Sequence, residues 1–148
     1  DPEGAPTYAA NLASYLAELD ALDADVRAAV AALPAERRIV VTSHDAFGYF
    51  EREYGLRFVA PQGVSTEAEA SARDVAKLIE QIRAERIPAV FVETIADPRL
   101  LEQIRRETGA EIGGALYSDA LSPADGPAPT YLAMMRHNLA TLTAALGS

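Results

Sequence analysis

Short apolar runs alternate with amphipathic segments along most of this chain, and few folds accept such an alternation. Residues 39–42 are β-branched and predict a buried strand, whereas the aromatic side chains of residues 47–54 recur at helical spacing. Ser43 and Asp45, between the two, carry side-chain oxygens suited to capping that helix. His44 therefore lies in the turn at the carboxyl end of a predicted strand, where open α/β sheets place their ligands.

The same strand-to-helix pattern returns three more times. The further strands are predicted at residues 56–60, 89–93 and 111–116, and the further helices at residues 71–86, 97–109 and from 130 onward. This order predicts an α/β fold with a four-stranded parallel sheet and helices on both faces. Gly113 and Gly114 fall inside the last strand, which indicates that another group approaches the backbone closely there.

A long helix is predicted ahead of the sheet. Apolar side chains recur every three or four positions over residues 5–33, and Pro34 ends the pattern. The helix exceeds the average length of ~11–12 residues, so we expect it to reach beyond one domain. We therefore predict a linker helix over residues 1–34 and an α/β domain over residues 35–148.

Composition excludes several classes of partner. The net charge of −9 argues against nucleic acid and anionic membranes, which both select clustered Lys and Arg. The chain has no cysteine, so it can form neither a disulfide nor a thiolate metal site. The sequence begins at Asp1-Pro2 within what reads as running sequence, so we expect a fragment or a processed form.

Three polar residues follow three of the predicted strands, namely His44, Glu93 and Asp119. Because parallel strands share one carboxyl edge, we expect these side chains to lie near one another. One imidazole and two carboxylates suit a divalent cation. Each residue also has a simpler interpretation. His44 could enter a helix, Glu93 could cap a helix or pair with an arginine, and Asp119 could form a turn. His137, inside the last helix, is predicted to be solvated or locally bonded.

Enzyme motifs are absent from the sequence. It contains no G-x-S-x-G, no Walker loop, no G-x-G-x-x-G and no H-E-x-x-H. Catalysis is therefore not the function we predict. The alternative to a metal-binding domain is a small flavodoxin-like α/β domain with an enzymatic or partner-binding role, in which His44 and Asp119 are ordinary loop residues.

Several separate segments together resemble one bacterial family. They are VTSHDAFGYFEREYGL, IPAVFVE, LYSDALS and YLAMMRHN, in that order. The chain is similar over its whole length to the carboxyl-terminal lobe of the solute-binding proteins of zinc and manganese ABC transporters, the TroA-like or cluster A-I group. In that family a long helix joins two α/β lobes, which implies that residues 5–33 are the interlobe helix and that the amino-terminal lobe is absent here.

The resemblance carries two metal ligands onto this sequence. His44 matches a family ligand that is His or Glu, and Asp119 in LYSDALS matches the late carboxylate ligand. Glu93 matches a recurrent glutamate and is carried over only as a group behind the ligands that orients one of them or tunes the local charge. The remaining family ligands are histidines of the amino-terminal lobe, and nothing in residues 1–37 replaces them.

The resemblance also implies a function. It implies the periplasmic or lipid-anchored solute-binding component of a bacterial metal ABC importer, which delivers its cation to a membrane permease. A His at position 44 favours zinc, with manganese next, although the chain without its partner lobe can be metal-free. Loss of that lobe would leave apolar surface along residues 5–33, which predicts self-association.

Overall fold

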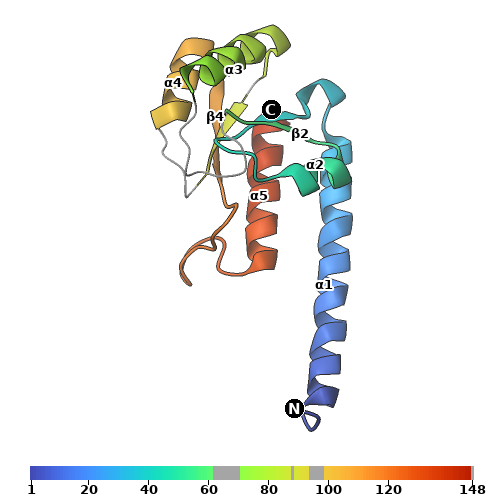
Figure 1. Cartoon of the computed structure of the whole chain (residues 1–148). Coiled ribbons are helices and arrows are strands. Elements are labelled where there is room, and N and C mark those ends of the chain that lie inside the picture. The colour runs from blue at the N-terminus through green and yellow to red at the C-terminus, as the bar shows by residue number, and fades with distance from the viewer. Residues whose placement is uncertain (62–70, 88, 94–98, 148) are drawn as a thin grey trace.

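A sheet of four parallel strands lies at the centre of the structure, a computed structural model that describes residues 1–61, 71–87, 89–93 and 99–147 (Figure 1). The strands are β1 (Ile39–Val41), β2 (Arg57–Val59), β3 (Ala89–Glu93) and β4 (Glu111–Leu116), in the spatial order β2-β1-β3-β4. Every pairing is parallel. The predicted fold class is confirmed.

Helices cover both faces of the sheet because neighbouring strand residues point to opposite sides. Val41 and Val90 face α3 (Ala72–Glu85) and α4 (Arg99–Thr108), in an apolar cluster that includes Ile79. Val40 and Phe91 face the opposite cluster, to which α1 (Ala5–Ala32) and α5 (Tyr131–Leu146) contribute. The short helix α2 (Gly48–Tyr54) and the 3₁₀ turn η1 (Ala35–Arg37) complete the described elements.

Three of the predicted helix starts are confirmed and one is wrong. Helix α1 starts at Ala5, as predicted. Ser71 caps α3 by accepting from the N–H of Asp74, and Thr130 caps α5 in the same way. Helix α2 starts later than predicted, with Phe47 at its N-cap and no side-chain capping bond. Ser43 and Asp45 therefore do not cap it. The predicted start of the helix at residues 97–98 lies outside the described residues.

Helix α1 is buried over only part of its length. Its carboxyl-terminal half packs on the sheet and α5 through Leu22, Val26 and Val30. Its amino-terminal half projects away from the rest of the structure, with large apolar side chains exposed at Tyr8, Leu12, Tyr15 and Leu16 (Figure 1). None of the helices in the described ranges is both long and apolar enough to cross a membrane.

Polar contacts attach α1 to α2. The Tyr54 hydroxyl donates to Asp23 (2.9 Å), and Arg27 pairs with both Asp23 and Glu53. Burial, together with the bond to Asp23, raises the pKa of Tyr54 to about 12. The hydrogen bonds from Arg27 and Tyr54 lower the pKa of Asp23. The helix that follows the His44 loop is thus held against α1.

The glycine pair in β4 marks a bulge. The β3–β4 register shifts between Val90 and Phe91, where Phe91 pairs with Gly114 and Gly113 becomes the extra residue. A Cβ added at Gly113 would lie 2.5 Å from Cε1 of Phe91, so only glycine fits beneath that ring. Beyond the bulge, Glu93 pairs with Leu116. The close approach predicted from the sequence is confirmed.

We expect Gly113→Ala to destabilise the fold by about 1–3 kcal/mol, the usual cost of overpacking. The new methyl group would press on the Phe91 ring and on Cβ of Ala145, 2.9 Å away. Gly48→Ala is the matched control, because nothing lies within 4 Å of its added Cβ. It should stabilise α2 slightly, by less than ~1 kcal/mol. Urea unfolding measures both variants, and equal effects would contradict this account of the bulge.

Candidate metal half-site

His44 follows β1 in a short buried loop. Thr42, Ser43 and His44 are all buried, and His44 is only 2% exposed. The carbonyl of His44 accepts two hydrogen bonds, from Oγ1 of Thr42 and from the N–H of Ala46, both at 3.1 Å. These bonds turn the chain sharply after β1. As a result the His44 ring is fixed at the carboxyl edge of the sheet, as predicted.

Glu93, the last residue of β3, holds this loop. Its Oε1 atom accepts hydrogen bonds from the Ser43 N–H (2.8 Å), the Ser43 Oγ–H (2.7 Å) and the His44 N–H (3.1 Å). Its Oε2 atom lies 2.6 Å from Nδ1 of His44. These two atoms are in close contact without hydrogen-bond alignment, and neither has a hydrogen-bond partner among the described residues. The Glu93 side chain is fully buried.

Both nitrogens of the His44 ring face a carboxylate oxygen, Nδ1 that of Glu93 and Nε2 that of Asp119. A hydrogen on Nδ1 would offset the repulsion between this nitrogen and Oε2 of Glu93, 2.6 Å away. With the hydrogen on Nδ1, the lone pair of Nε2 can bind a cation. Nε2 faces away from Glu93 and toward Asp119, at 3.1 Å from Oδ2.

Asp119 follows β4 and contacts His44 from the solvent side. Its side chain is 61% exposed, whereas that of His44 is 2% exposed. Both residues line an open cavity of about 520 Å³, together with Asp45, Tyr49 and Arg52. The structure therefore brings His44, Glu93 and Asp119 together at one edge of the sheet. Glu93 lies behind the histidine, and Asp119 lies at the opening.

His44 and Asp119 alone would be too few to close a metal coordination shell. Within the described ranges, no group of three or more His, Cys, Asp or Glu side chains is placed to hold a metal ion. A structural zinc site usually has ~4 ligands. His44 and Asp119 share one cavity, but a closed shell would need ligands from elsewhere. His137 is not one of them, since its Nε2 lies 3.2 Å from the carbonyl of Ala115 and its ring contacts Tyr117. The local bonding predicted for His137 is confirmed.

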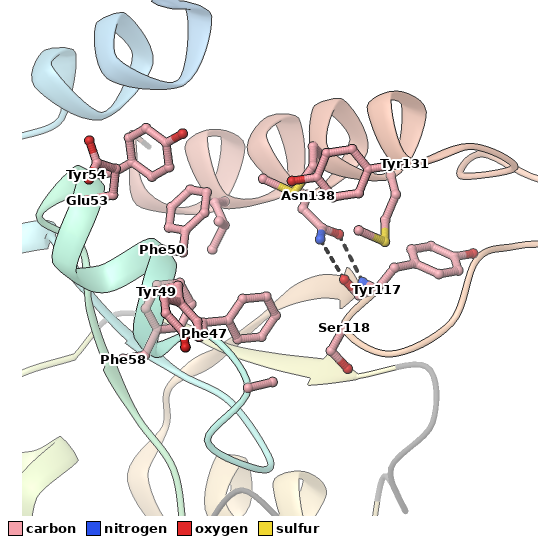
Figure 2. A pocket seen from close by; sticks show the side chains of 14 residues that line it. Phe47, Tyr49, Phe50, Glu53, Tyr54, Phe58, Tyr117, Ser118, Tyr131 and Asn138 are labelled. Atoms are coloured by element: carbon pink, nitrogen blue, oxygen red, sulfur yellow. Dashed lines mark hydrogen bonds between the residues drawn. The ribbon is translucent and has the colours of Figure 1, made fainter. Parts of the chain in front are cut away.

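An apolar groove of about 470 Å³ adjoins the half-site between α2 and α5. Figure 2 shows its aromatic side chains, Phe47 and Phe50 among them, facing Tyr117 and Tyr131 across the groove. Sequence reasoning did not single out Asn138, which lines this groove and bonds to the Tyr117 backbone. A signal was present, because Asn138 is polar within the otherwise apolar stripe of α5.

A comparison with models of protein families shows which family the chain belongs to. The model of the family described as zinc-uptake complex component A, periplasmic (ZnuA), matches residues 1–145. The chain belongs to this family. The resemblance to metal-transporter solute-binding proteins is confirmed, and the flavodoxin-like enzyme alternative gains no support.

Relatives in the ZnuA family are named for different metals. The zinc-binding protein TroA of Treponema pallidum is 45% identical over 138 residues, which cover 90% of this chain and 45% of that protein. The iron-binding protein YfeA of Yersinia pestis is 37% identical over 147 residues, 99% of this chain and 47% of that protein. The manganese-binding lipoprotein MntA of Bacillus subtilis is 37% identical over 150 residues, 98% and 49% respectively.

Solved structures agree with this assignment. The periplasmic zinc-binding protein TroA from Treponema pallidum superposes with a TM-score of 0.94 at 41% identity, covering 98% of this chain and 54% of that one. A periplasmic metal-binding protein from Candidatus Liberibacter asiaticus gives a TM-score of 0.88 at 29% identity, covering 99% and 54%. The chain spans about half the length of the curated relatives it matches.

We expect Glu93→Ala to lower the free energy of unfolding by about 3 kcal/mol or more. The change leaves two buried backbone N–H groups and the Ser43 hydroxyl without their acceptor. The control is Glu102→Ala, since the contact of Glu102 with described residues is an exposed pair with Arg105 on α4. Its effect should stay within ~0.5 kcal/mol. Similar losses in urea unfolding would show that Glu93 does not anchor the loop.

Proposed function

We propose that this chain is the carboxyl-terminal lobe of the solute-binding component of a bacterial metal ABC importer, and that His44 and Asp119 supply half of the ligands to the transported cation. The observation that supports this most directly is the 3.1 Å separation of His44 Nε2 and Asp119 Oδ2, which line one open cavity. The two residues are 75 positions apart in the sequence of a chain that belongs to the ZnuA family.

The separation suits a shared cation. Zinc binds histidine nitrogen at ~2.0–2.1 Å and carboxylate oxygen at ~2.0–2.2 Å, so two tetrahedral ligands of one ion lie roughly 3.3 Å apart. The separation of 3.1 Å between Nε2 and Oδ2 is close to that value. A cation could therefore enter from the solvent side, contact both atoms and displace them only slightly.

Glu93 supports the site without touching the ion. It lies on the far side of the imidazole and holds Nδ1, so that Nε2 faces the cavity. Carboxylates placed in this way fix the tautomer of a ligating histidine and raise its basicity. Its three hydrogen bonds to residues 43 and 44 leave the Glu93 carboxylate no freedom to turn toward the ion.

Zinc is the cation we favour, with manganese next. The proposed half-set contains one imidazole nitrogen, and nitrogen ligands favour zinc over manganese, which prefers carboxylate and water oxygens. The relatives named for zinc, iron and manganese show that the family scaffold serves several metals. The choice depends on the complete ligand set.

The remaining ligands come, on this proposal, from a second lobe. Residues 1–34 would form the interlobe helix and residues 35–148 the carboxyl-terminal lobe. The exposed apolar side chains at the start of α1 offer a packing surface for the missing lobe, and the relatives are about twice as long as this chain. The lipoprotein names among them support a place outside the cytoplasmic membrane, beside a permease.

In the two-lobed protein, His44→Ala and Asp119→Ala should each weaken zinc binding at least about 100-fold, beyond the ~10–100-fold typical of groups behind the ligands. His137→Ala should leave the affinity unchanged, because its ring contacts Ala115 and Tyr117 instead. Competition titration against a zinc chelator measures all three variants. Equal losses in the three would remove the ligand assignment.

The 148-residue chain by itself should bind zinc weakly. The chain supplies two of the ~4 ligands that zinc takes, so water must complete the coordination shell. Water molecules bind independently of the protein and therefore do not raise its affinity for the ion. Isothermal titration with zinc measures this affinity directly. A submicromolar one-to-one complex would contradict the half-site account, unless sedimentation shows that two chains have associated.

A further inference from the structure

Asn138 is a buried polar residue in the apolar stripe of α5. It is 5% exposed and lies between the buried side chains of Met134 and Leu142, one turn away on either side. An amide in such a place is costly unless all of its polar atoms find partners. Its presence therefore calls for a specific bonding role.

Both ends of the Asn138 amide bond to the same residue. Oδ1 accepts from the N–H of Tyr117 at 2.9 Å, and Nδ2 donates to the carbonyl of Tyr117 at 2.7 Å (Figure 2). Among the described residues, the last β3–β4 pair is Glu93 with Leu116, one residue before Tyr117. The amide of Asn138 thus bonds both backbone polar groups of Tyr117 and extends the bonded backbone one residue beyond β4.

Asp119 depends on that extension. The chain passes from Tyr117 through Ser118 directly to Asp119, whose side chain is mostly exposed. Beyond its contact with His44, the carboxylate has one long hydrogen bond to a described residue, at 3.4 Å from Oγ of Ser118. Little packing therefore holds this side chain, and its position follows from the backbone just before it.

We propose that Asn138 is a positioning residue that holds Asp119 beside His44 by fixing the Tyr117 backbone. The proposal rests on the proposed function of Asp119 as a metal ligand and adds a residue on α5 that determines how well it binds. Asn138 touches neither the half-site cavity nor His44. Its replacement should weaken zinc binding about tenfold, in the range of groups that orient ligands.

The neighbouring residue on α5 provides a matched control. His137 also contacts the end of β4, but it bonds to the carbonyl of Ala115, which lies inside the ladder and pairs with Val92. Strand pairing fixes Ala115 with or without His137. His137→Ala should therefore change zinc affinity by less than about twofold, although it alters the same helix and the same strand end.

A double-mutant cycle tests the proposal in the natural full-length protein. Asn138→Leu, which keeps the volume and removes the amide, is combined with Asp119→Ala, and zinc affinity is measured by chelator competition. Asn138→Leu should lose about tenfold in the parent protein and less than about twofold in the Asp119→Ala background. A merely structural role would produce the same loss in both backgrounds.

The possible results separate the role of Asn138 from the role of Asp119 as a metal ligand. An equal loss in both backgrounds, or no loss in either, overturns the role of Asn138 while the role of Asp119 stands. If Asp119→Ala itself costs nothing, the proposed function fails and the Asn138 inference falls with it. Should Asn138→Leu not fold, amide hydrogen exchange of the parent protein replaces it. Protection of the Tyr117 N–H as strong as that of the β4 amides supports the positioning role of Asn138. Exchange as fast as that of exposed loops overturns it.

Discussion

The candidate site depends on the hydrogen bonds that the buried carboxylate of Glu93 accepts from the loop after β1. An ionised carboxylate in a protein interior is costly unless several donors surround it. Glu93 finds three of them in the backbone and hydroxyl of Ser43 and the backbone of His44. The loop after β1 therefore cannot leave the end of β3 without leaving a charge unpaired. The same side chain places its other oxygen against Nδ1 of His44 and directs Nε2 outward. One residue thus anchors the loop and orients the proposed ligand.

The strand order explains how residues far apart in the sequence meet. His44 follows β1 and Asp119 follows β4, and β3 lies between these strands. Two strand spacings, about 9–10 Å, separate the two strand ends, yet the side chains meet over the end of β3 at 3.1 Å. This requires β4 to end at the correct height. The bulge at Gly113 sets that height by shifting the register, and α5 then holds the strand end through Asn138.

Much of this arrangement was predictable because it follows from periodicity along the chain. The alternation of strands and helices predicts a parallel sheet, and a parallel sheet brings the residues after its strands to one edge. His44, Glu93 and Asp119 were found in this way. The role of Ser43 was not, because helix capping is a local signal, whereas its hydroxyl bonds to a residue 50 positions away. Asn138 was missed for the same reason, since its partner lies across the β4–α5 contact.

On the proposed function, the unequal exposure of His44 and Asp119 suits a protein that must release the cation it binds. His44 is almost fully buried and is held from behind, so it cannot move to follow an ion. Asp119 is exposed, so on the same proposal it exchanges an ion for water without disturbing the core. On the proposed function, tight binding requires the second set of ligands to lie at high effective concentration beside this pair. Moving the second set away would then lower the affinity sharply, and this lobe would not need to rearrange. A lobe that supplies only part of the ligands is therefore compatible, on this proposal, with both capture and release.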